Sequence, residues 1–165
     1  MTTAPATPVY RDPRRYLWLL SLGAPLCAVF TSTLVSLTQI KAFWWIGVLV
    51  FFVIIPLVDW ASGVDGINPP DWAYRQLSND KFYRWCTFLF LPLNFIAFVI
   101  AAYLWGDGAL SIVDKVGLAM TIGLFSGLGI NAAHELGHRS DRLERWLAKL
   151  ALTQSAYGHF VVEHN

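Results

Sequence analysis

Long apolar segments separated by short polar connections dominate the chain. Four of them are almost free of charged residues: residues 16–37, 43–58, 85–105 and 112–133. Because an α-helix rises about 1.5 Å per residue, crossing a hydrocarbon core about 30 Å thick takes roughly 20 residues. The pattern therefore predicts an all-α, polytopic membrane bundle with about four transmembrane helices, of which the second is the shortest.

Composition supports a lipid environment. Hydrophobic residues make up 56% of the chain and charged residues only 14%, against about 25% charged residues in soluble domains. Most of the tryptophans fall near the predicted membrane ends, where an amphipathic ring prefers the headgroup level. The alternative, a buried helical hairpin of a soluble protein, does not account for this much apolar surface in a chain of 165 residues.

Basic residues gather on alternate connections between the predicted spans. The tail 1–15, the connection 59–84 and the segment after the fourth span carry ten of the twelve Lys and Arg residues, and only Lys41 and Lys115 lie on the other side. The positive-inside rule therefore predicts an inner-membrane protein whose N-terminus and post-span-four segment face the cytoplasm. A net charge of +1 gives no indication of a nucleic-acid partner.

The connection between the second and third spans is the first sizeable polar segment. It contains Asn68-Pro69-Pro70-Asp71, a turn sequence that stops helix on both sides, so we expect mainly loop between residues 59 and 84. Its four aspartates are most simply interpreted as part of a solvated loop, and the alternative is that they cover or face the active site. They are Asp59, Asp65, Asp71 and Asp80.

An amphipathic helix is predicted after the fourth span. Asp141 and Glu144 resemble a capping box at its start. Apolar residues then recur at helical spacing, with basic residues on the other side; the apolar set is Leu143, Trp146, Leu147 and Leu150, and the basic set is Arg142, Arg145 and Lys149. This pattern is typical of a helix lying on the cytoplasmic membrane interface.

Histidines at the end of the fourth span carry the candidate chemistry. His134 and His138 are four residues apart, so in a helix their rings project from one face and can bind one metal ion or two neighbouring ions. His164 is a further candidate ligand about thirty residues later, and His159 is expected to be structural or to support a ligand. Glu135 points about 100° away from the histidine face, so we expect it to support a ligand or to be structural and not to bind the metal directly.

Two other classes of function fit the same residues. The pattern from His134 to His138 is also the zincin signature, in which Glu135 is the base and Glu163 would be the third zinc ligand of an intramembrane protease. On spacing alone, iron and zinc stand about equal. A third possibility is a non-catalytic membrane fragment without a working metal site.

Two runs of the sequence resemble a known family. Residues 131–139 (Asn-Ala-Ala-His-Glu-Leu-Gly-His-Arg) and 157–165 (Tyr-Gly-His-Phe-Val-Val-Glu-His-Asn) look like the first and second histidine boxes of the membrane-bound alkane 1-monooxygenases, within the membrane desaturase and hydroxylase group. Residues 59–71 also resemble the loop between spans two and three of that family, so the similarity runs from about residue 11 onward.

The resemblance implies hydroxylation of a linear alkane at its terminal carbon, with O₂, a non-haem diiron centre held mainly by histidines, and electrons from rubredoxin. By position, His134 and His138 match the histidines of the first box, and His164 matches the first histidine of the second. The family motif continues past Asn165 with more histidines. We therefore expect residues 16–165 to be an incomplete catalytic domain after the 1–15 tail, inactive by itself.

The helix face that continues from His134 suggests a route for substrate. It carries Ile130, Gly127, Gly123 and Met120. The commoner role of a small-residue pair at this spacing is close helix packing, and the alternative is that the glycines leave room for an alkane. Asn94 and Asn131 are expected to form hydrogen bonds. The basic cluster from Arg139 to Lys149 is expected to bind anionic lipid or to dock an acidic electron carrier.

Overall fold

The structure, a computed structural model, describes residues 9–64, 68–139, 141–159 and 163. Helices account for the regular structure of these residues. In chain order they are a 3₁₀ segment Arg15–Gly23, α1 Cys27–Thr38, a 3₁₀ segment Lys41–Trp45, α2 Ile46–Leu49, a π segment Val50–Ile54, α3 Ile55–Ser62, α4 Asp71–Ser78, α5 Lys81–Gly106, α6 Ile112–Gly137 and α7 Arg142–Thr153.

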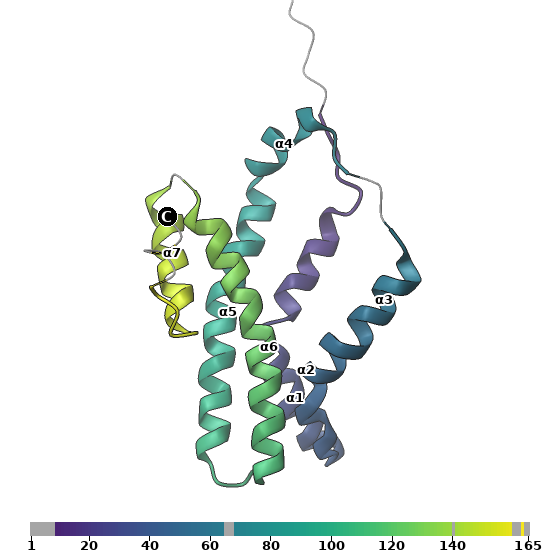
Figure 1. Cartoon of the computed structure of the whole chain (residues 1–165), viewed down its shortest axis with the longest axis vertical. Helices are drawn as coiled ribbons and strands as arrows, with labels where there is room; N and C mark the ends of the chain where they lie inside the picture. Colours follow the sequence, from purple (N-terminus) through teal and green to yellow (C-terminus); the bar gives the residue numbers. More distant parts are fainter. Residues whose placement is uncertain (1–8, 65–67, 140, 160–162, 164–165) are drawn as a thin grey trace, which may run out of the picture.

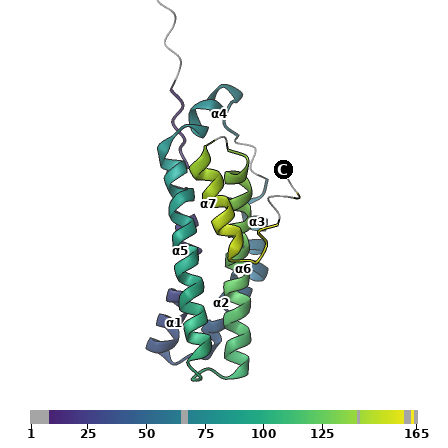
Figure 2. The same cartoon turned by 90° about the vertical axis from the view of Figure 1, so that its left-hand side faces the viewer.

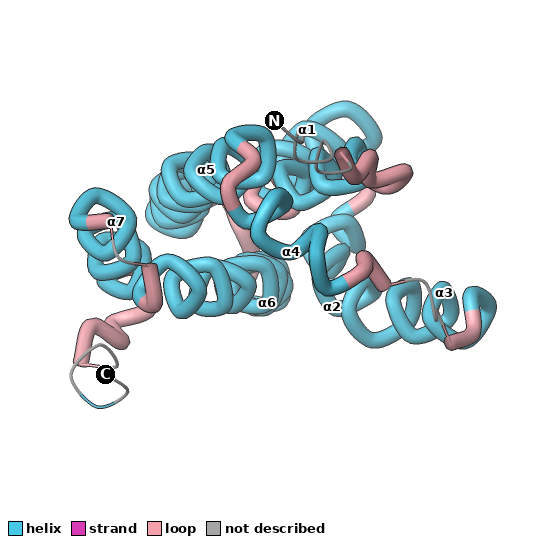
Figure 3. Tube along the Cα trace, turned by 90° about the horizontal axis from the view of Figure 1, so that it is seen from above, coloured by secondary structure: helices cyan, strands magenta, loops and turns pink. Residues whose placement is uncertain are grey.

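An antiparallel pair, α5 and α6, forms the centre of the molecule (Figure 1). α1 and α2 lie beside the lower half of this pair, whereas α3 diverges from it (Figure 1). Seen from above, α7 lies on the far side of α5 and α6 from α3 (Figure 3). The helix pair thus separates α7 from α3.

Three helical stretches are long and apolar enough to cross a membrane: Lys41–Ser62, Lys81–Gly106 and Ile112–Gly137. They confirm the second, third and fourth predicted spans, but the second covers 22 residues and is not short. The first predicted span differs. It is broken into Arg15–Gly23 and Cys27–Thr38, bent by 61°, at Pro25, which lacks the N–H that would continue the helix.

Close packing joins the second span to α6. A β-carbon on Gly47 would stand 2.5 Å from the Cα of Thr121, so only glycine allows this approach. The Thr121 hydroxyl donates to the carbonyl of Trp44 at 2.7 Å and accepts from the backbone N–H of Gly47 at 3.0 Å. These bonds satisfy polar groups in a region that we assign to lipid, where water cannot do so.

The basic segments share one end of the bundle. The N-terminal segment, α4 and the turn between α6 and α7 all lie at the top of Figure 1, as the charge pattern predicts. Lys41 lies at the opposite end, 3.5 Å from Asp114 of α6. The structure thereby groups the cationic connections, and the assignment of their end to the cytoplasm stays a prediction.

The connection between α3 and α5 is more ordered than expected. α3 continues to Ser62, and α4 begins at Asp71 directly after the Pro69-Pro70 pair, because proline at a helix start needs no N–H partner. Asp80 is not a solvated loop residue. It caps α5 by accepting the Phe82 N–H at 2.9 Å, and it pairs with Arg15. Asp65 lies outside the described residues.

α7 folds back along the α5–α6 pair (Figure 2). That this helix lies on the cytoplasmic membrane interface stays a prediction. Its protein-facing side consists of Glu144, Ala148 and Leu152, and Leu143 and Trp146 are exposed. The predicted capping box is only half correct. Asp141 caps the helix through the Leu143 N–H at 2.9 Å, whereas Glu144 pairs with Arg84 at 2.9 Å.

Candidate functional site

The two histidines of the first motif lie next to each other at the end of α6. His134 is in the last turn, and His138 is the C-cap, still in right-handed helical conformation. Their Nε2 atoms are 3.0 Å apart, their ring centroids are 4.6 Å apart, and the ring planes are nearly perpendicular at 89°. The helix therefore brings both imidazoles to one point, as their spacing predicts.

The separation of these nitrogens fits a shared metal ion. An imidazole nitrogen binds a transition metal at about 2.0–2.1 Å, so two of them at right angles around one ion lie about 3 Å apart. Among the described residues, no third His, Cys, Asp or Glu joins them to complete a site. His164, the remaining predicted ligand, lies outside the described residues.

The later histidine segment makes a different local pair. His159 and Glu163 lie one helical turn apart, with 4.0 Å between Nε2 and Oε2, and the Glu163 N–H donates to the His159 carbonyl at 3.1 Å. Glu163 is thus not grouped with His134 and His138 as a third zincin ligand. A structural role of His159 beside Tyr157, whose ring centroid is 4.6 Å away, stays a prediction.

Glu135 faces a different set of elements from the histidine pair. It lines two cavities, of about 380 and 270 Å³, which Trp18 and Thr87 also line. The larger of these cavities also contains Arg84 and Arg139. The Glu135 side chain of α6 therefore faces α5 and the first 3₁₀ segment. Asn131 is exposed, and its hydrogen bonding stays a prediction.

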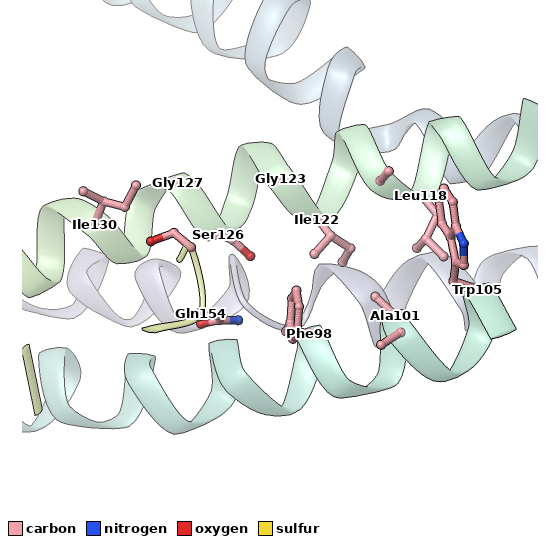
Figure 4. A pocket seen from close by; sticks show the side chains of 13 residues that line it. Phe98, Ala101, Trp105, Leu118, Ile122, Gly123, Ser126, Gly127, Ile130 and Gln154 are labelled. Carbon is pink, nitrogen blue, oxygen red and sulfur yellow. The ribbon is translucent and has the colours of Figure 1, made fainter. Parts of the chain in front are cut away.

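An apolar cavity of about 490 Å³ lies between α5 and α6 (Figure 4). We call it the inner pocket. It extends along α6 from Leu118 to Ile130, about 18 Å at the helical rise. The residues labelled around it in Figure 4 are Phe98, Ala101, Trp105, Leu118, Ile122, Gly123, Ser126, Gly127, Ile130 and Gln154. Ile130 lies one turn before His134, so one end of the pocket approaches the histidine pair.

Gly123 and Gly127 line open space. A β-carbon built on either one would meet no atom of the described residues within 4 Å, so the expected close helix packing is absent there. The close approaches occur instead at Gly117, against Trp45, and at Gly129, against Asn94. Ile130, Gly127 and Gly123 are pocket residues, whereas Met120 is not among those that line it.

A hydrogen-bonded pair of amides lies beside the inner pocket, which Gln154 lines and Asn94 does not. Gln154, the C-cap of α7, donates from Nε2 to the Asn94 carbonyl at 2.8 Å and accepts from Asn94 Nδ2 at 3.0 Å. Asn94 is buried in α5. These two bonds confirm the prediction that it forms hydrogen bonds. A lone polar residue in an apolar span was the signal for Asn94; Gln154, in an ordinary helix end, had none.

Comparison with known proteins gives a consistent result over nearly the whole chain. Alkane 1-monooxygenase 1 of Alcanivorax borkumensis is 34% identical over 156 residues, which are 94% of this chain and 39% of the relative. Alkane 1-monooxygenase of Pseudomonas putida is 34% identical over 160 residues, which are 97% of this chain and 40% of the relative. That of Acinetobacter baylyi is 37% identical over 156 residues, which are 93% of this chain and 38% of the relative. No protein-family model matches the chain.

The chain thus spans about 40% of the length of the relatives that it matches. Its α6 histidines, its apolar pocket and its membrane-length helices all fall inside the matched stretch.

Proposed function

We propose, from the premise that this chain is a homologue of the alkane 1-monooxygenases, that the protein to which it belongs hydroxylates linear alkanes at the terminal carbon. The observation that carries this proposal is the continuity of one face of α6. That face presents Gly123, Gly127 and Ile130 to the inner pocket and then His134 and His138 at its end.

The inner pocket suits an unfunctionalised hydrocarbon. An alkane offers no polar group to recognise, so its binding depends on shape and on burial of methylenes, about 0.8 kcal/mol each. Apolar side chains such as Phe98, Leu118 and Ile122 line most of the pocket. Held there, the chain would direct one end past Ile130 toward the histidines, and this fixed approach would favour reaction at a terminal carbon.

His134 and His138 are the residues that would hold iron, with His164 and further ligands outside the described residues. Their nitrogens, 3.0 Å apart, can share one ion, which would be one iron of a non-haem diiron centre. Iron, when bound, supplies the activation of O₂ that an inert C–H bond requires. The task of this chain is to orient both rings on one helix end and to keep the approach apolar.

Rubredoxin is the proposed electron donor, and the basic end of the bundle is the proposed docking surface. Arg139, Arg142 and Arg145 are exposed beside the end of α6, on the same side as the histidine pair. An acidic carrier would be attracted to this surface, and the attraction would weaken with salt. In this proposal the site faces the cytoplasm at the inner membrane, and the lipid bilayer supplies the alkane.

A zinc protease remains the second candidate because His134, Glu135 and His138 keep the zincin pattern. Two observations favour the monooxygenase over it. The similar proteins are named alkane 1-monooxygenases, and Glu163 is paired with His159 instead of joining the first two histidines.

The direct test is to incubate the full-length protein that contains this sequence with a linear alkane, O₂, rubredoxin and a reductase system. The proposal predicts a 1-alkanol as product, with loss of at least 100-fold in rate for His134→Ala and His138→Ala, since removal of a metal ligand disables the site. A protein that cleaves peptides and forms no alcohol would replace the proposal with the protease.

A further inference from the structure

Polar side chains of the inner pocket gather toward its histidine-side end. They are Ser126 of α6 and, at the C-terminal end of α7, Gln154 and Ser155. Trp105 contributes an indole N–H at the opposite end (Figure 4). The other residues that line the pocket have apolar side chains or are glycines. The pocket is therefore a long apolar space with a polar group of side chains toward one end.

The bonds of Gln154 fix the level of this polar group along α6. Its amide is joined to Asn94 by two hydrogen bonds, and a β-carbon on Gly129 would come within 2.9 Å of Asn94 Nδ2. Gly129 precedes His134 by five residues, about 7.5 Å at the helical rise. Ser126 lies about one further turn from His134. The polar group thus lies at the end where the proposed function places the reacting carbon.

These side chains have hydrogen-bonding capacity that the fold does not use. No hydrogen bond joins the Ser126 hydroxyl to another residue in the described part of the chain. Gln154 uses one N–H and one lone pair for Asn94, whereas a primary amide has two of each. Ser155 donates to the Leu152 carbonyl at 3.1 Å, and its oxygen can still accept. An alkane cannot use this capacity, but a hydroxyl group can.

We propose that Ser126 and Gln154 form a subsite for the hydroxyl group of a primary alkanol, whose hydrocarbon chain lies along the apolar part of the inner pocket. The inference rests on the proposed function, because hydroxylation of a terminal carbon would create this hydroxyl at the same end. Withdrawal of the product from the histidine pair by one to two helical turns, about 5–11 Å, would bring its hydroxyl to these side chains. The subsite would distinguish the product from the substrate, since the two differ by one oxygen atom.

The test is a competition experiment with the full-length protein in lipid nanodiscs. A linear alkane with a terminal diazirine is photo-crosslinked to the pocket, and unlabelled decane or 1-decanol competes with it. The quantity compared is the ratio of the two concentrations that halve the labelling. Both compounds partition into the same bilayer in every variant, so a change of this ratio between variants reports the pocket alone. The experiment needs neither iron nor turnover.

Ser126→Ala should weaken competition by 1-decanol about fivefold relative to decane, which corresponds to loss of one neutral hydrogen bond of about 1 kcal/mol. Ser126→Thr keeps a hydroxyl and should retain the wild-type ratio. Trp105→Phe is the matched control, because it removes the N–H at the other end of the pocket. Its effect on the shape of the pocket applies to both compounds, so the ratio should be unchanged.

The direction in which the alkanol lies gives an independent readout. A 1-alkanol that carries a diazirine at the carbon farthest from its hydroxyl should label the Trp105 end of the pocket, for example Leu118. The adducts are located by mass spectrometry. Labelling of Ile130 instead would place the hydroxyl at the wrong end and overturn the proposal.

An unchanged ratio in Ser126→Ala also overturns it, and so does an equal change in Trp105→Phe. Gel filtration and thermal unfolding verify folding; if Ser126→Ala does not fold, Ser126→Cys replaces the hydroxyl by a weak donor of similar volume. If neither decane nor 1-decanol competes in any variant, the proposed occupant of the pocket fails together with the subsite. If both compete with a ratio that no variant changes, the subsite alone fails.

Discussion

Arg84, near the start of α5, places its Nη2 atom 2.9 Å from Oε1 of Glu144 on α7. Glu144 is 4% exposed, so this contact supplies a charge partner for a carboxylate that water barely reaches. The same guanidinium lies 3.6 Å from Asp141, the N-cap of α7. Arg84 therefore ties the start of α7 to α5, beside the cavity that Glu135 lines.

Arg84→Ala should lower the free energy of unfolding by about 1–3 kcal/mol, because Glu144 is left buried without its partner. This range of the loss in unfolding free energy already includes a reduction for solvent screening, because the Arg84 side chain is 39% exposed. Thermal or denaturant unfolding in detergent measures it. Arg145→Ala, an exposed change on the same helix, should stay within about 0.5 kcal/mol. Equal losses in the two variants would contradict the role of the pair.

Gly129→Ala and Gly123→Ala provide a matched comparison on one helix. A β-carbon at Gly129 would stand 2.9 Å from Asn94 Nδ2, whereas one at Gly123 would meet no described atom within 4 Å. We expect Gly129→Ala to destabilise the protein by about 1–3 kcal/mol through overpacking. Gly123→Ala should be neutral or stabilise the helix by about 0.5–1 kcal/mol. Unfolding curves that rank the variants in the opposite order would refute the packing described for α5 and α6.

Asp80 should make the stability of the protein depend on pH in the acidic range. The hydrogen bonds from Arg15, and then from the Phe82 N–H, hold the pKa of Asp80 below its ordinary value. The stabilisation is therefore complete above the unfolded pKa of about 4 and is lost as the pH falls through the lower folded pKa. Unfolding midpoints measured between pH 5 and pH 2 should fall less in Asp80→Asn and Arg15→Met than in the wild type. If the unfolding midpoints of all three proteins fall by the same amount over this pH range, Asp80 does not link stability to pH.

Gly127→Leu should shift the products of the full-length enzyme toward shorter alkanols, because the added side chain fills space in the inner pocket. Its iron content should be unchanged. Product analysis by gas chromatography with mixed alkanes measures the shift. Met120→Leu is the control, since Met120 does not line the pocket. An unaltered length preference with normal iron would show that the glycine face is not the substrate route.

Much of the fold follows from local rules. Charge-free length located three of the spans, and the i, i+4 spacing placed His134 beside His138, because both depend only on helix geometry. The break of the first span at Pro25 was missed. Its apolar residues are continuous in sequence, so hydropathy does not register the 61° bend.

Tertiary contacts are what local patterns do not reveal. Leu143 and Trp146 are exposed, as an apolar face toward lipid would be, whereas Glu144 faces the protein, where Arg84 of a distant helix meets it. Gly123 and Gly129 look alike in sequence, but only the second has a neighbour, Asn94, in the described part of the chain. The junction of Asn94 with Gln154 joins residues 60 positions apart, which no local pattern reveals.

The central claim is that His134 and His138 hold iron at the end of an apolar pocket. Metal analysis of the purified full-length protein tests it most directly. We predict about two iron ions per chain, lost in His134→Ala and His138→Ala and retained in Met120→Leu. Zinc in place of iron, or iron that persists without both imidazoles, would contradict it.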